Sequence, residues 1–257
     1  SYPTTDHAHH FIMFDLNHIA LFFICTLTSA FTAGLGVGGG AILLVLLPNF
    51  LAPNLVIPIH GATQLMSNSS RLLFDWKTVS WPLVRPYIPG ALIGGVLGYF
   101  LLDLFAFDLL PLILGVFILV CTWTHVIRRM SILFDNMFLL GLFQTCASLF
   151  VGAIGLIMPP ILIRQGLNRD QVISTQAAMV SFMHAFKVAT YMAAGFAFRD
   201  HWQLMVLMLA GSAFGSYAGR FLRNAIPEQR GLWLMKWLVT VLALQLVLKY
   251  LFTTYLK

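Results

Sequence analysis

Eight apolar stretches, separated by short polar connections, run through the 257 residues of the chain. They cover residues 18–47, 55–74, 82–102, 109–127, 137–163, 172–197, 202–221 and 232–254. A helix of about 20 apolar residues crosses the ~30 Å hydrocarbon core of a bilayer. The pattern therefore predicts an all-α bundle of membrane-spanning helices.

Two of these stretches are longer than one crossing needs, and small residues interrupt each of them. The first break is Gly34-Leu35-Gly36-Val37-Gly38-Gly39-Gly40, and the second is Gly152-Ala153-Ile154-Gly155. Lipid cannot hydrogen-bond a broken backbone, so such breaks persist only inside protein or beside a cavity. Paired breaks in two halves of a chain point to the binding site of a transporter.

The two halves also match weakly after their breaks. Thr63-Gln64 follows the first break as Thr175-Gln176 follows the second. Spaced glycines, which let helices approach closely, recur in both halves at Gly90, Gly94, Gly95 and Gly98, and at Gly211, Gly215 and Gly219. We expect one membrane domain of two inverted repeats, each a broken or re-entrant helical hairpin plus about three transmembrane helices. Its parts are an N-terminal tail 1–17, a first repeat 18–127, a linker 128–136 and a second repeat 137–257.

The placement of charge favours this topology. If both broken stretches return to the side from which they entered, one side of the membrane holds the connections 71–85, 128–136, 164–171 and 220–236. These carry 11 of the 15 lysines and arginines, and the other side carries three. Cytoplasmic loops are rich in Lys and Arg. A topology in which every stretch crosses once loses most of this bias, although residues 18–37 are long enough to span alone.

Composition narrows the class of protein. The mean hydropathy is +0.86 and 9% of residues are charged, against about 25% in soluble domains. The net charge of +6 lies in short loops, so we expect no nucleic-acid partner. Three cysteines without ligand spacing predict no metal site, and we expect no cofactor and no removable signal peptide. The segment 6–10, Asp-His-Ala-His-His, is a weak metal-binding candidate or a plain tail.

Polar residues inside the apolar stretches are the candidate ligands of a substrate. Lys187 lies near the middle of 172–197, where a lysine costs about 2.5–3.5 kcal/mol on insertion scales, so function is the default hypothesis. His184 shares its helical face. The functional interpretation is a cation and a proton carrier that face an anion path. The alternatives are a lysine that snorkels to the interface and an interior histidine with satisfied hydrogen bonds.

A polar face is predicted for 55–74, because His60, Gln64, Ser67, Asn68 and Arg71 recur there at helical spacing. It either lines the substrate path or holds helices together by hydrogen bonds. Arg71, at the helix end, is interpreted as a cytoplasmic anchor.

The breaks themselves offer backbone N–H groups at half-helix starts, which attract anions. The candidate substrate-binding residues are Gly38, Gly39, Gly40, His60, Gln64, Ser67, Asn68, Gly152, Gly155, Gln176, His184 and Lys187.

Three segments carry a family resemblance. GLGVGGGAILLVLLP and HGATQLMSNSSRLLFDW in the first half, and GAIGLIMPPILIRQGLNRDQVISTQAAM in the second, resemble the TauE/SafE family of sulfite and organosulfur-anion permeases. The resemblance covers nearly the whole chain after residue 18, although the second break lacks a full glycine triplet. It implies a multi-pass permease of the cell inner membrane and not an enzyme. Its partners would be a small anion, the lipid bilayer and, in one alternative, further copies of the chain.

We predict a permease for small sulfur-containing anions of the sulfite, thiosulfate or organosulfonate class. Export is expected, because a membrane potential of 100 mV drives one charge outward with ~2.3 kcal/mol. The alternative is a proton- or sodium-coupled transporter of a small carboxylate anion, with His60 or His184 as the proton site. A membrane enzyme acting on lipid or quinone is disfavoured, because the sequence shows no cluster of carboxylates and no His-metal motif.

Overall fold

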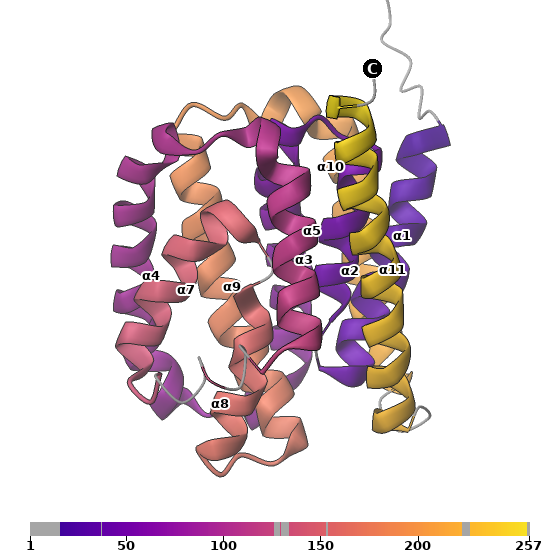
Figure 1. Ribbon diagram of the computed structural model, residues 1–257. Helices are drawn as coiled ribbons and strands as arrows, with labels where there is room; N and C mark the ends of the chain where they lie inside the picture. The colour runs from indigo at the N-terminus through magenta and orange to yellow at the C-terminus, as the bar shows by residue number, and fades with distance from the viewer. Residues whose placement is uncertain are drawn as a thin grey trace, which may run out of the picture.

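The computed structural model describes residues 16–36, 38–125, 129, 134–152, 154–222 and 227–255, and within them the regular elements are helices (Figure 1). The segment 6–10 and most of the predicted tail and linker lie outside the described residues. The helices are α1 (Leu16–Leu35), α2 (Gly39–Leu46), α3 (Pro53–Asp75), α4 (Trp81–Leu101), α5 (Leu110–Trp123), α7 (Met137–Val151), α8 (Met158–Arg164), α9 (Arg169–Ala193), α10 (Trp202–Leu222) and α11 (Glu228–Tyr255).

Both predicted breaks interrupt the helices where the glycines stand. α1 ends at Leu35 and α2 begins at Gly39, with Gly38 at a φ of 103° that residues with a Cβ rarely adopt. α7 ends at Val151, Gly152 has a φ of 72°, and a 3-10 turn over Ile154–Ile157 leads into α8. The sequence pattern thus located both interruptions correctly.

Local capping signals set other helix ends. The side chain of Asn168 accepts from the Gln171 backbone N–H while the Gln171 side chain accepts from the Asn168 N–H, a capping box that starts α9. Asn136 accepts from the N–H groups of Phe138 and Leu139 at the start of α7.

Four helices of the described chain are long and apolar enough to cross a membrane: Leu16–Leu35, Trp81–Leu104, Phe198–Leu222 and Gln229–Thr254. α3 and α9 are as long but more polar, and they pack against each other in the middle of the bundle. Their polar faces are buried by protein rather than by lipid, which is what a polar residue at membrane depth requires. The protein is an integral membrane protein.

The predicted glycine faces are confirmed as sites of close helix contact. A Cβ added to Gly211, Gly215 or Gly219 of α10 would overlap backbone oxygens of α1, and one added to Gly90 or Gly94 of α4 would overlap those of α7. α1 therefore packs on α10, and α7 packs on α4. The outer pairs join each half of the chain to the other, around the central pair of α3 and α9.

One end of the bundle, called the basic end here, holds the described parts of the predicted basic connections. There Ser80, between α3 and α4, donates to Thr175 of α9 at 2.9 Å, and Arg164 pairs with Asp135 ahead of α7. At the opposite end Asn49, after α2, accepts from Gln245 and Lys249 of α11. In Figure 1 the turn after α8 lies at the lower, basic end and the C-terminus at the upper end.

Each broken stretch thus forms a hairpin. α1 runs from the upper end to the basic end and α2 returns, while α7 and α8 leave from and return to the basic end (Figure 1). The description of the halves 18–127 and 137–257 as inverted repeats stays a prediction.

Candidate functional site

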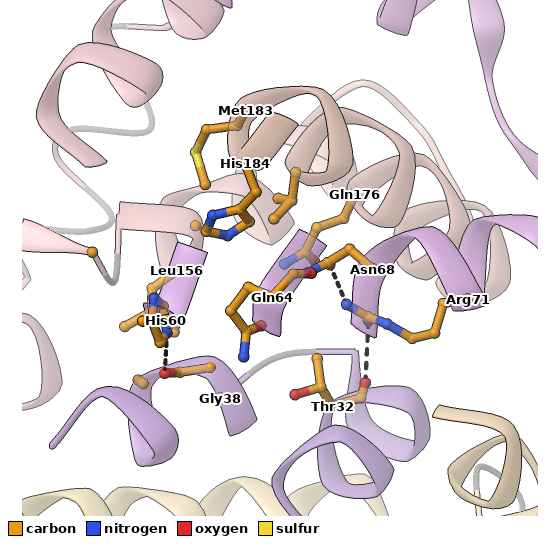
Figure 2. Close-up of a pocket in the computed structure, with 15 residues that line it drawn as sticks. Thr32, Gly38, His60, Gln64, Asn68, Arg71, Leu156, Gln176, Met183 and His184 are labelled. Carbon is orange, nitrogen blue, oxygen red and sulfur yellow. Dashed lines mark hydrogen bonds between the residues drawn. The ribbon is translucent and has the colours of Figure 1, made fainter. Parts of the chain in front are cut away.

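A cavity of about 50 Å³ lies where the two breaks meet the polar faces of α3 and α9 (Figure 2). Its lining comes from both halves of the chain: Thr32, Gly38, Gly40, Ala41, His60, Gln64, Asn68, Arg71, Gly152, Gly155, Leu156, Gln176, Val180, Met183 and His184. Nine of the twelve residues predicted from the sequence are among them: Gly38, Gly40, His60, Gln64, Asn68, Gly152, Gly155, Gln176 and His184.

The other three predicted residues lie outside the lining. Gly39 packs against α1, where a Cβ would overlap the carbonyl oxygen of Thr28. The Ser67 hydroxyl contacts the Ser216 hydroxyl of α10 at 3.2 Å. Lys187 is completely buried, and its ammonium donates to the backbone oxygen of Ser148 at 2.7 Å.

Two glutamines at matching positions of the halves reach the same cavity. Gln176 follows Gln64 by 112 positions, the spacing that also separates Gly152 from Gly40. All four line the cavity, and Figure 2 shows both glutamine side chains there. A Cβ at Gly40 would lie 3.0 Å from Gln64 Oε1, so the break leaves room for the amide. The Gln176 Oε1 atom is buried and has no partner among the described residues.

The two histidines form a pair inside the cavity. The rings of His60 and His184 meet edge to face, with centroids 5.9 Å apart. His60 Nε2 lies 2.9 Å from the Gly40 carbonyl oxygen, which only accepts, so Nε2 is the donor. Both Nδ1 atoms are buried without a hydrogen-bond partner among the described residues. They are therefore available to a substrate or to water.

Arg71 is the residue that the sequence interpretation placed wrongly. Its side chain is only 2% exposed and lines the cavity, so it is not a surface anchor. The guanidinium donates to Asn68 Oδ1 and, at 3.5 Å, to the Thr32 carbonyl oxygen (Figure 2). The signal was present, because Arg71 continues the helical spacing of His60, Gln64 and Asn68.

Basic side chains neutralise the carbonyl ends of both broken helices. The C-terminal end of a helix carries partial negative charge. Arg71 and Arg169 donate to the Thr32 and Gly34 oxygens at the end of α1. Lys187 donates to the Ser148 oxygen near the C-terminal end of α7. Since no acidic residue is among the lining residues, the cavity is electrostatically suited to a small anion.

Replacing Lys187 by methionine is expected to destabilise the fold by about 1.5–3 kcal/mol, because it removes a hydrogen bond from a charged donor and leaves the buried Ser148 oxygen with the Gly152 N–H at 3.2 Å. Thermal unfolding of Lys187→Met in detergent measures this effect, and Lys249→Met, a substitution at an exposed lysine, is the control. If Lys187→Met unfolds like the parent but binds substrate much more weakly, the lysine contacts the anion instead.

Membrane-length helices, two broken hairpins and a buried polar cavity between them define a membrane transporter. The family described as "Sulfite exporter TauE/SafE" matches residues 21–247, and the chain belongs to this family. The resemblance read from the motifs is thereby confirmed. Neither the comparison with curated proteins nor that with solved structures gave a match.

Proposed function

We propose that the protein is a permease that exports small sulfur-containing anions across the cell inner membrane. The observation that carries this proposal is the cavity: the Arg71 guanidinium and the side-chain amides of Gln64 and Gln176 lie in its lining, and none of its described lining residues is acidic. Family membership supports the sulfur-containing class. The nine predicted lining residues together with Arg71 form the proposed binding site. Gly39, Ser67 and Lys187 lie outside the lining and contact the neighbouring helices α1, α10 and α7.

The size of the cavity favours the smallest members of this class. One water molecule needs about 10–15 Å³ of such space, so about 50 Å³ holds a few waters or one compact oxyanion. Sulfite and thiosulfate fit this description better than a sulfonate with a carbon chain.

The direction follows from charge. Without Arg71, which lies in the cavity wall, ten of the fifteen basic residues fall in the sequence connections assigned to the basic end, which by the positive-inside rule is cytoplasmic. An anion is driven out of a negative cytoplasm by ~2.3 kcal/mol per charge per 100 mV. Export therefore needs no coupling carboxylate, in keeping with a cavity that has none in its lining.

Purified protein in liposomes tests this function. Liposomes loaded with sulfite, thiosulfate, ethanesulfonate or lactate are given an inside-negative potassium diffusion potential, and efflux is followed. We expect sulfite and thiosulfate to leave faster than from protein-free liposomes, with acceleration by the potential and slower efflux of ethanesulfonate. Efflux of lactate alone would favour the carboxylate alternative, and no efflux of any sulfur-containing anion would reject the proposal.

A further inference from the structure

A second hollow lies at the basic end, directly beside the cavity. It encloses about 410 Å³ between the end of α1, α8 and the starts of α9 and α11. Its walls include Leu35, Pro160 and Ile163, which are apolar, and Arg169. It is therefore large enough to admit a hydrated small anion and carries a cation at the end of the bundle where basic residues gather.

The barrier between this hollow and the cavity is thin. Gln176 lines both spaces. Beside it, the first break lies against α9: a Cβ at Gly36 would be 2.8 Å from Ile173 Cγ1. Gly36 has a φ of 85°, so the glycine permits this close approach. A small separation of the break from α9, or a new rotamer of Gln176, would join the two spaces.

The hollow at the upper end of the bundle differs from the lower hollow in its relation to the cavity and in its charge. A hollow of about 270 Å³ near Asn54, Asp103 and Phe107 shares no described lining residue with the cavity. It carries an acidic side chain where the lower hollow carries Arg169. On the cavity's upper side, Gly152 packs closely on Leu44. Of these two hollows, the lower one carries the cation and shares a lining residue with the cavity, so it is the one that favours entry of an anion.

We propose that the lower hollow is the cytoplasmic mouth of the transport path, which takes a small oxyanion at Arg169 and passes it to the cavity across the barrier of Gly36, Ile173 and Gln176. The proposal rests on the proposed transport function and adds a second binding site to it. Arg169 donates to the Gly34 oxygen at 3.3 Å and has a further partner, but a guanidinium has five N–H donors and can bind an oxyanion in addition to these contacts.

Filling the mouth tests the path. Ile163 lines the hollow and is 61% exposed, so Ile163→Cys should fold normally. The variant is labelled with fluorescein maleimide, whose thioether bond survives sulfite, and is then reconstituted. We expect the labelled variant to lose most of its efflux and the unlabelled variant to keep it. Efflux at the parent rate after complete labelling would overturn the proposal.

Two controls separate blockage from damage. Val96→Cys, 52% exposed, lines a hollow between α4 and α9 that shares no described residue with the mouth, so its labelled form should transport normally. The parent protein, with its own Cys146 half-buried, receives the same treatment. Loss of efflux in labelled Val96→Cys as well as in labelled Ile163→Cys would reject a specific block of the mouth.

Arg169→Gln provides a second readout. We expect the half-saturating concentration of sulfite to rise about two- to fivefold, as for an exposed ion contact, with the maximal rate unchanged and with Arg169→Lys close to the parent. An unchanged half-saturating concentration would overturn the proposal. A change seen only in liposomes of anionic lipid would assign the hollow to a lipid headgroup and would overturn it as well. If the parent protein gives no efflux, the proposed transport function itself is rejected. If the parent gives efflux and the variants are unaffected, only the proposed mouth is rejected.

Discussion

A valine in place of Gly40 is expected to reduce efflux to the level of protein-free liposomes while the protein stays folded. Gly40 faces the cavity, and the nearest atom to an added Cβ is Gln64 Oε1, at 3.0 Å. The end of a glutamine side chain can move aside, so the fold should tolerate the substitution. The three carbons of valine would fill much of a cavity of about 50 Å³ and leave no room for the substrate.

The neighbouring glycine provides the contrast. At Gly39 an added Cβ would overlap the Thr28 backbone oxygen, which cannot move without shifting α1. Gly39→Ala is therefore expected to lower the free energy of unfolding by about 1–3 kcal/mol or more, as at other overpacked sites, and so to impair folding. Gly155→Ala, whose Cβ would meet only Val180 at 3.8 Å, is the control that should fold normally.

Size-exclusion profiles, thermal unfolding and sulfite efflux are measured together for the three variants. Gly40→Val with parent-like efflux would move the binding site away from the first break. Gly39→Ala with parent-like stability would show that α1 and α2 are not held at this distance.

Loss of the Arg71 guanidinium is expected to weaken anion binding by about 1.5–3 kcal/mol, the range for a hydrogen bond to a charged group. This corresponds to about a ten- to hundredfold higher dissociation constant for Arg71→Gln. Arg71→Lys should recover part of the affinity, because it keeps the charge but not the planar donor geometry. Equilibrium binding of radiolabelled sulfite in detergent, at a matched folded fraction, measures the effect.

A purely structural role for Arg71 predicts another outcome. Its contact with the Thr32 oxygen ties α3 to α1, so Arg71→Gln would then lower thermal stability and leave the affinity of the folded fraction unchanged. Ser67→Ala is the matched control, since Ser67 lies on the same helix but contacts α10 outside the cavity. The affinity of Ser67→Ala for sulfite should equal that of the parent protein.

The contrast between Arg71 and Lys187 shows where prediction from the sequence ended. Both are buried cations within long, polar helices. The depth of Lys187 made it the favoured ligand, and the position of Arg71 near a helix end made it an anchor. In the fold, Arg71 lines the cavity, whereas Lys187 lies outside the lining and donates to the Ser148 carbonyl oxygen. Ser148 lies 39 positions before Lys187, so no local pattern pairs the two residues. A helical pattern predicts a face but not the neighbour that the face meets.

The sequence by itself determined the helical membrane class, the two breaks, the polar faces of α3 and α9, and the glycine faces of α4 and α10. Each follows from a local rule: the thickness of a bilayer, the need to satisfy backbone hydrogen bonds in lipid and the period of a helix. The tertiary structure alone decided which residues share the cavity. Gly39 and Gly40 are adjacent in sequence but point in different directions on α2, one onto α1 and the other into the cavity. Ser67 finds its partner 149 positions away. Such pairings depend on how distant helices pack, which no local pattern encodes.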